Sequence, residues 1–321
     1  MILVTGAGGF IGGHLVADLL QRGHAVRAVD YKPLNRWHQL HAAAVNQPNY
    51  DLRRMDNCHY AARGCHTIYN LAADMGGMGF IEKHKADCML SVLINTQLLQ
   101  AAHVNKVDRY FFSSSACVYA AGKQDSAQPA PLVESDAYPA APEDGYGWEK
   151  LFSERMCRHF LEDYQLETRV ARYHNVYGTY GTWEGERAKA PAALCRKVAE
   201  AAQSGNHTIS IWGDGEQARS FMHIDDCVRG TVEVAAGQWS DPVNLGSSEL
   251  VTINQLVSIL EEIAGIKLTR TYELSAPRGV RGRNSDNTLF RSRYGWEPSV
   301  PLRLGMEQLY RWVYDQVALR R

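Results

Sequence analysis

Short apolar runs alternate with longer amphipathic stretches through the first half of the chain. The apolar runs have the length and composition of strands buried on both faces, and they lie at residues 2–4, 25–30, 67–71, 110–114 and 167–173. The stretches between them have the apolar spacing of helices, at residues 12–21, 86–104 and 144–164. Since strands that alternate with helices usually pair in parallel, the pattern predicts an α/β fold with a doubly wound parallel sheet.

The pattern changes after about residue 175, where a loop rich in glycine and threonine begins. Further elements are predicted as helices at 191–203, 254–264 and 302–318 and strands at 208–212, 242–246 and 267–272. We expect the strand at 242–246 to return to the first sheet. The chain is thus predicted to form a nucleotide-binding domain over residues 1–175, with a returning segment near 220–262, and a smaller α/β lobe mainly over residues 176–321. A ligand is expected in the cleft between them.

The charge of the chain is almost balanced, with 34 Lys and Arg residues against 35 Asp and Glu residues. This balance provides no global field for nucleic acid or an anionic membrane, so we expect neither as a partner. No stretch is long and apolar enough for a membrane span, and a strand at the first residues argues against a signal peptide.

The seven cysteines show neither a CxxC pair nor a Cys/His spacing typical of a zinc site. Scattered cysteines in a long chain indicate reduced thiols and a cytoplasmic protein, and no metal site is expected.

A glycine-rich loop, TGAGGFIG, follows the first strand and opens the first helix. Gly6 permits a tight turn, Gly9 lets backbone N–H groups approach a pyrophosphate, and Gly12 lets the helix pack close to the sheet. Asp30 ends the second strand, where its carboxylate would accept hydrogen bonds from a ribose diol and repel a 2′-phosphate. Although Lys32 is an argument for NADP, the loop and the acid together predict a Rossmann-type domain that binds NAD.

Tyr146 and Lys150 lie four residues apart in a predicted helix, hence on one face. A free tyrosine has a pKa of about 10, but a nearby ammonium group and a nicotinamide cation would favour its phenolate. Ser115 ends the strand before this helix and can hydrogen-bond the substrate hydroxyl that Tyr146 deprotonates. A solvated surface pair is the alternative interpretation of the Tyr146–Lys150 spacing.

Together, the glycine loop, Ser115, Tyr146 and Lys150 resemble the extended short-chain dehydrogenase/reductase family. The segments NVYG at 175–178 and RSF at 219–221 are similar as well. The resemblance implies a nucleotide-sugar substrate and a homodimer packed through the helix of Tyr146 and its neighbour. It also implies an NAD site formed by Gly6, Gly9, Phe10, Ile11, Gly12, Asp30, Asp51, Leu52, Leu71, Ala72, Ala73, Tyr146 and Lys150.

Longer motifs resemble the GDP-mannose 3,5-epimerase branch of that family. They are AADMGGMGFI at 72–81, SSACVY at 114–119, KAPAA at 189–193, WGDG at 212–215 and GVRGRNSDN at 279–287. The resemblance implies that Tyr146 starts a transient oxidation at C4, after which Cys117 and Lys189 exchange protons at C3 and C5. It further implies substrate contacts from Gly76, Gly77, Asn175, Lys197, Gln217, Arg219 and Arg283.

Several alternatives stay open. The serine strand ends in Ser-Ala-Cys where a dehydratase would have Thr-Asp-Glu, which disfavours dehydration. Ala188 stands where the resembled enzymes have a glutamate, and the nearest carboxylate, Glu186, is displaced. The chain could therefore invert C3 or C5 alone, act on a related GDP-sugar such as a GDP-heptose, or be a simple NAD-dependent 4-epimerase or reductase. Cys117 could be a small buried hydrophobic residue, and the whole chain could be a non-catalytic NAD-binding scaffold.

Overall fold

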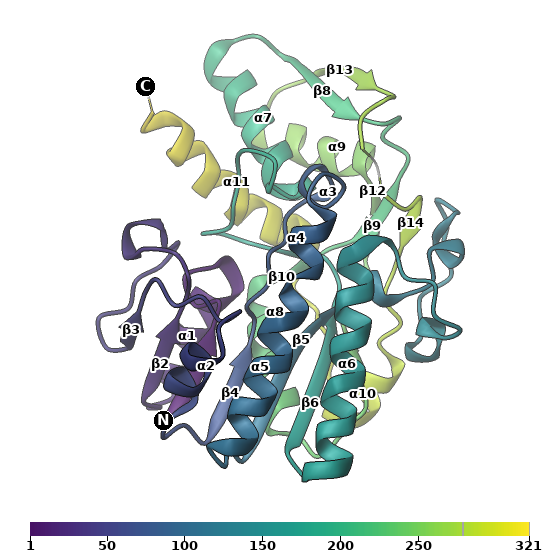
Figure 1. Ribbon diagram of the computed structural model, residues 1–321. Coiled ribbons are helices and arrows are strands. Elements are labelled where there is room, and N and C mark those ends of the chain that lie inside the picture. Colours follow the sequence, from purple (N-terminus) through teal and green to yellow (C-terminus); the bar gives the residue numbers. More distant parts are fainter. Residues whose placement is uncertain (278, 321) are drawn as a thin grey trace.

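The central element of the computed structural model, which describes residues 1–277 and 279–320, is a parallel sheet (Figure 1). Its seven strands follow the order β11-β6-β5-β4-β1-β2-β3. Their bounds are Ile2–Thr5 (β1), Val26–Val29 (β2), Val45–Gln47 (β3), Thr67–Asn70 (β4), Arg109–Ser115 (β5), Glu167–Tyr173 (β6) and Val243–Leu245 (β11). The predicted doubly wound parallel sheet is therefore confirmed, including the late strand that returns to pair with β6.

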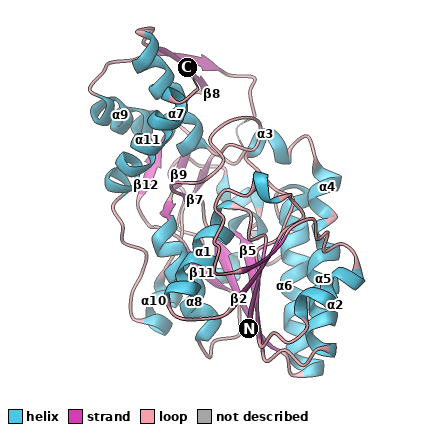
Figure 2. Ribbon diagram, turned by 90° about the vertical axis from the view of Figure 1, so that its left-hand side faces the viewer, coloured by secondary structure: helices cyan, strands magenta, loops and turns pink. Residues whose placement is uncertain are grey.

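Helices cover both faces of this sheet (Figure 2). One face packs against α1 (Phe10–Gln21), α8 (Ile224–Ala236) and α10 (Thr288–Tyr294). The other face packs against α2 (Met55–Ala62), α5 (Ser91–Val104) and α6 (Asp144–Tyr164). Ile2 and Val4 belong to the first core whereas Leu3 belongs to the second, because successive side chains of a strand point to opposite faces. Burial on both sides explains why these strands are continuous apolar runs.

A second, smaller lobe lies above the carboxyl ends of the strands in Figure 1. It contains α7 (Ala190–Ser204), α9 (Ile253–Ala264), α11 (Leu302–Ala318) and the parallel pair β8 (Thr208–Trp212) and β13 (Thr269–Glu273). The three helices bury a core of their own, with Val198, Leu256 and Leu309 almost fully buried. All five elements were predicted from the sequence at closely similar bounds.

Several elements differ from the sequence-based prediction. The helix expected over residues 86–104 is two helices, α4 (Lys85–Met89) and α5, separated by Leu90. The prediction missed α8, and a glycine within this helix explains why: Gly230 packs so close to Leu245 that a Cβ would lie 2.5 Å from its Cδ1. Because glycine has a low helix propensity, a glycine at this position indicates the end of a helix when only the sequence is considered.

Short elements complete the chain. The prediction also missed α2, α3 (Met78–Ile81), α10, β3, β7 (Val176–Tyr177), β9 (Ala218–Ser220), β10 (Met222–His223), β12 (Leu250–Thr252) and β14 (Gly282–Arg283). Single turns of 3-10 helix occur at Leu34–Arg36, Ala116–Val118, Ala121–Gln124 and Glu134–Ala137. None of the helices in the described part of the chain has the length and apolar character needed to span a membrane.

Candidate active site

A cavity of about 870 Å³ runs along the carboxyl ends of the parallel strands and beneath the second lobe. This edge of a doubly wound sheet is where such folds usually bind ligands. Every site residue predicted from the sequence lines this one cavity: Gly6, Gly9, Phe10, Ile11, Gly12, Asp30, Asp51, Leu52, Leu71, Ala72, Ala73, Gly76, Gly77, Ser115, Cys117, Tyr146, Lys150, Asn175, Lys189, Lys197, Gln217, Arg219 and Arg283.

The glycine loop fits tightly between β1, β4 and α1. Gly6 has a φ of +68°, and a Cβ there would lie 3.0 Å from the Leu71 carbonyl. A Cβ at Gly12 would lie 2.2 Å from the Gly6 oxygen, so α1 could not pack against the loop with a larger residue. Helix α1 starts after Gly9, which has no side chain to bond the first N–H groups. Those N–H groups and the helix dipole form a suitable site for a pyrophosphate.

Asp30 is almost fully buried at the end of β2. Its carboxylate accepts hydrogen bonds from the backbone N–H of Gly8 (3.0 Å) and of Lys32 (2.9 Å). The Lys32 ammonium, the one sequence argument for NADP, donates to the carbonyl of Gly8 at 3.2 Å. Farther along the cavity, Asp51 forms an ion pair with Arg53 at 2.8 Å. An acid held at the end of the second strand fits the ribose of NAD.

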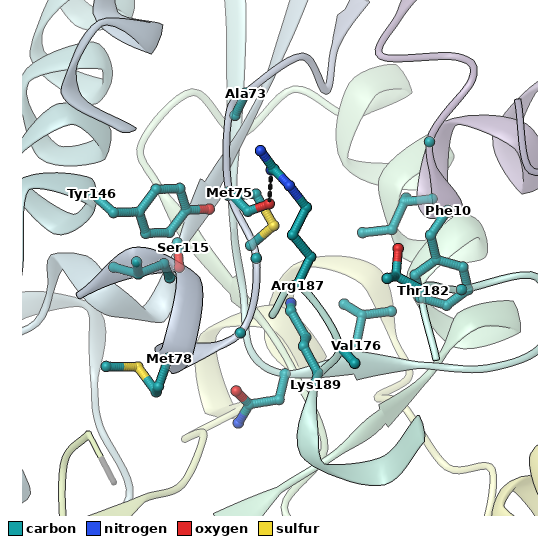
Figure 3. Close-up of a pocket in the computed structure, with 18 of the residues that line it drawn as sticks. Phe10, Ala73, Met75, Met78, Ser115, Tyr146, Val176, Thr182, Arg187 and Lys189 are labelled. Atoms are coloured by element: carbon teal, nitrogen blue, oxygen red, sulfur yellow. Dashed lines mark hydrogen bonds between the residues drawn. The ribbon is translucent and has the colours of Figure 1, made fainter. Parts of the chain in front are cut away.

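Tyr146 and Ser115 meet on one side of the cavity (Figure 3). Burial raises the pKa of the Tyr146 phenol well above its usual range, while a hydrogen bond with Ser115 acts in the opposite direction. The Lys150 ammonium lies 5.6 Å from the centre of the Tyr146 ring and 3.8 Å from a carboxylate oxygen of Glu149. Both side chains come from α6, one helical turn apart, as the spacing predicted. The solvated surface pair is excluded because both are buried.

Cys117 differs from the other six cysteines, since it is partly exposed and they are buried. It lines the cavity, and its Sγ lies 3.4 Å from the Nη1 of Arg283. Helix α6 packs directly against its backbone: a Cβ on Gly147 would lie 2.3 Å from the Cys117 carbonyl oxygen. A thiol that faces a cavity beside a guanidinium group does not fit the interpretation as a simple buried hydrophobic residue.

Lys189 immediately precedes α7 and extends into the middle of the cavity (Figure 3). Its backbone is extended, with φ −87° and ψ 160°, and the proline at the start of α7 favours this helix start. Burial lowers the pKa of the Lys189 ammonium, and the charge of Cys117 partly opposes this. A lysine with a lowered pKa loses its proton more readily and can act as a base nearer neutral pH.

Several cations line the part of the cavity nearest the second lobe, among them Lys197, Arg219 and Arg283. Burial, together with the charge of Arg283, lowers the pKa of Arg219 to about 10. Lys197 donates to the carbonyl of Ser210 at 2.6 Å. Arg283 is held by an ion pair with Glu143 at 2.8 Å. This concentration of positive charge fits a diphosphate, although the contact with Cys117 places Arg283 at the reacting end of the cavity as well.

The polar side chains expected to hold the substrate are themselves held by backbone groups. Asn175 donates to the carbonyl of Ser220 at 3.0 Å, and Gln217 donates to the carbonyl of Trp212 at 2.8 Å. Each therefore has a defined orientation before any ligand binds, which reduces the entropic cost of recognition.

Gly76 and Gly77 pack against the segment before α7. A Cβ on Gly76 would lie 3.0 Å from the Cα of Arg187, and one on Gly77 would lie 2.5 Å from the carbonyl oxygen of Ala188. Sequence reasoning missed Arg187, which lines the cavity next to these glycines. Nor did it identify Glu143, whose contact with Arg283 joins positions 140 residues apart. No local spacing signals either of these contacts.

The carboxylate nearest to Lys189 in sequence does not replace the absent glutamate at position 188. Glu186 is half-exposed and pairs with Lys83 at 3.2 Å and with His84 at 3.7 Å. Glu186 thus lines the cavity with its carboxylate engaged by two residues that follow α3, while position 188 itself carries only a methyl group.

Comparison with known proteins agrees with this geometry. GDP-mannose 3,5-epimerase 1 of Oryza sativa subsp. japonica is 43% identical over 98% of this chain and 82% of its own length. GDP-mannose 3,5-epimerase of Arabidopsis thaliana is 42% identical over the same shares. Among solved structures, UDP-glucose 4-epimerase of Thermotoga maritima superposes with a TM-score of 0.87, at 25% identity over 98% of this chain and 99% of that one.

A second solved structure was determined with its cofactor. UDP-glucuronic acid 4-epimerase of Bacillus cereus, in complex with UDP-glucuronic acid and NAD, superposes with a TM-score of 0.82, at 26% identity over 98% of this chain and 99% of that one. Residues 2–246 match the NAD dependent epimerase/dehydratase family, which confirms the expected family and its cofactor, NAD. The chain is a member of the NAD-dependent epimerase/dehydratase family.

Proposed function

We propose that this protein is a GDP-mannose 3,5-epimerase. The observation that carries the proposal is that Cys117 and Lys189, from different lobes, both reach the cavity lined by Tyr146 and Ser115. A simple 4-epimerase needs no acid or base beyond Tyr146. The thiol and the lysine therefore indicate chemistry at the carbons next to C4.

The first step is removal of the proton from the C4 hydroxyl of the sugar by Tyr146, with Ser115 bonded to the same oxygen. When bound, NAD supplies the reversible acceptor for the C4 hydride and a positive charge that favours the Tyr146 phenolate. Lys150 adds a second positive charge one helical turn away. These charges would oppose the burial that raises the pKa of Tyr146.

The resulting ketone at C4 makes the hydrogens on C3 and C5 acidic. Cys117 comes from the turn after β5 and Lys189 from the start of α7, so the two groups approach the sugar from different elements. One group removes a proton from the carbon to give an enediolate, and the other donates a proton of its own to the opposite face. Both groups then exchange protons with solvent. Arg283 donates a hydrogen bond to the Cys117 sulfur and so holds it in the cavity. At the end the hydride would return to C4 and Tyr146 would give its proton back to the C4 oxygen, so the reaction would consume no cofactor.

The Lys197, Arg219 and Arg283 cluster supports binding of the diphosphate of a GDP-sugar in the second lobe. We propose the division into an NAD-binding domain at residues 1–175, with the returning segment near 220–262, and a sugar-nucleotide lobe mainly at 176–321. Exposed aromatic side chains on α6, Trp148 and Phe152, support a homodimer packed through this helix and its neighbour. A reducing, cytoplasmic setting would keep Cys117 as a thiol.

The test is incubation with GDP-mannose in deuterated water, with NMR analysis of the sugar. The expected result is deuterium at C3, at C5 or at both, with no net change in NADH. Absence of solvent deuterium from both carbons would contradict the proposal and favour 4-epimerisation, while a stoichiometric change in NADH would indicate a net oxidoreductase. Because Ala188 supplies no carboxylate beside Lys189, GDP-heptoses are included as substrates.

A further inference from the structure

Two segments from different lobes meet over the cavity. One is the loop after β4, residues 72–77, which leads into α3; the other is residues 183–189, which lead into α7. The Gly77 N–H donates to the Arg187 carbonyl at 3.1 Å. We call this meeting of the two segments the lobe crossing. Arg187, where the two segments are hydrogen-bonded, precedes Lys189 by two residues.

The Arg187 side chain makes three contacts across the lobe crossing. Its Nη1 donates to the Met75 carbonyl at 2.8 Å, which Figure 3 shows as a dashed line, and lies 2.7 Å from a carboxylate oxygen of Asp74. Its guanidinium carbon lies 3.6 Å from the centre of the Phe80 ring. A charge-assisted hydrogen bond, an ion pair and a cation–π contact thus converge on one residue.

The receiving loop is anchored in the NAD-binding domain. The Asp74 N–H donates to the hydroxyl of Ser91 at 2.9 Å, at the start of α5. Arg187 therefore connects the segment of Lys189 to a helix that packs on the central sheet. On its other side Lys189 is joined to α7, which is held in the core of the second lobe.

We propose that Arg187 is a positioning residue for Lys189: it holds the lysine at its place in the cavity by tying the segment before α7 to the loop after β4. This inference rests on the proposed function for the role of Lys189 in catalysis. The physical reason is that proton transfer depends steeply on distance, and a base displaced by about 1 Å can lose about a hundredfold in rate.

A matched control lies beside the lobe crossing. Lys83, just after α3, pairs with Glu186 of the segment 183–189 at 3.2 Å, but both side chains are more than half exposed. Exposed ion pairs contribute little to stability, so loss of this pair should leave the segment in place. Arg187→Met retains an apolar stem for Phe80 and removes the charge and both polar contacts, whereas Lys83→Met removes only the exposed pair.

The first measurement needs no substrate. Hydrogen–deuterium exchange by mass spectrometry should be about tenfold faster in Arg187→Met over residues 183–189 and 72–77, with α1 and α11 unchanged. NMR titration of the NAD-bound protein with ¹³Cε-labelled lysines, assigned with Lys189→Gln, should show a higher Lys189 pKa in Arg187→Met. In the wild-type protein burial lowers the pKa of Lys189. A loosened segment would admit water, which solvates the ammonium group and raises this pKa. Lys83→Met should match the wild-type protein in both measurements.

The second measurement uses turnover. In Arg187→Met, the rate of solvent deuterium incorporation into the sugar should fall at least about tenfold. The rate of NADH formation in a single turnover should stay within about threefold of the wild-type rate. Arg187→Lys, which can restore the ion pair with Asp74, should recover part of the loss.

The inference is overturned if Arg187→Met leaves both the exchange of 183–189 and the titration of Lys189 unchanged. Acceleration throughout the molecule, or an equal effect from Lys83→Met, would also overturn it, since either result means general destabilisation. Failure of the proposed function is a separate result. The wild-type protein would then incorporate no deuterium from solvent, while hydrogen exchange and the Lys189 titration would still report on the position of Lys189.

Discussion

The Arg283 guanidinium lies 3.4 Å from the Cys117 sulfur, and the two residues are 166 positions apart in the chain. Arg283 comes from β14 in the second lobe, while Cys117 follows β5 of the central sheet. A guanidinium N–H at this distance can donate a hydrogen bond to the sulfur and so fix its position in the cavity. The contact therefore links the two lobes at the point where proton exchange is proposed.

Cys117→Ser should separate proton exchange from hydride transfer. A serine hydroxyl of similar size occupies the same place but is a far weaker base, so deuterium incorporation at the sugar carbon it serves should fall by about a hundredfold or more. Formation of NADH on mixing with the sugar nucleotide should persist, because Tyr146 and Ser115 are unchanged. Cys195→Ser, at a buried cysteine outside the cavity, is the control. Equal loss of both activities in Cys117→Ser would contradict an acid/base role.

Tyr146→Phe should abolish turnover without loss of the cofactor. The phenol oxygen is the proposed proton acceptor at C4, and its removal should lower the rate about 10²–10⁴-fold. NAD binding, measured by calorimetry, should be nearly unchanged, because the glycine loop and Asp30 are intact. Full activity in this variant would favour a non-catalytic NAD-binding scaffold.

Gly12→Ala should disturb the NAD site. The added methyl group would lie 2.2 Å from the Gly6 carbonyl oxygen, so either the loop or α1 must shift. A forced shift of this kind costs about 1–3 kcal/mol, and it displaces the N–H groups proposed to bind the pyrophosphate. We expect lower affinity for NAD and a lower melting temperature. Gly122→Ala, where a Cβ meets no atom within 4 Å, should change neither.

His174 should make the protein less stable in mild acid. It is buried, and burial lowers its pKa to about 3, with a hydrogen bond to Asn244 opposing and Arg283 adding to the shift. In the unfolded chain histidine titrates near about 6.5, so the unfolded state takes up the proton first as the pH falls. The stability contribution is complete above about pH 6.5 and declines between about pH 6.5 and 3.

This histidine alone should lower the free energy of unfolding by up to about 1.4 kcal/mol between pH 7.5 and 5.5. Urea unfolding at the two pH values checks this. His174→Gln should reduce the difference between the two values, whereas His207→Gln, at an exposed position, should not. An unchanged pH dependence in His174→Gln would show that other groups cause it.

Local pattern was sufficient for most of the fold. Alternating apolar runs and amphipathic stretches indicated six of the seven central strands, because burial on both faces leaves a continuous apolar signature. Strand β3 was missed, since Val45–Gln47 is short and none of its three residues is buried. Helix α8 was missed because it contains Gly230, which disfavours a helix in the sequence pattern. The close packing of Gly230 against Leu245, which requires this glycine, is visible only in the tertiary structure.

The sequence by itself determined which residues gather at the candidate site. Motifs placed at the carboxyl ends of parallel strands must meet at one edge of the sheet, and those predicted residues do line one cavity. Only the tertiary structure decided how the site is held together. The contacts of Arg187 with Asp74 and of Arg283 with Glu143 join positions more than a hundred residues apart. Spacing along the chain carries no information about such pairs, because they depend on how the two lobes pack.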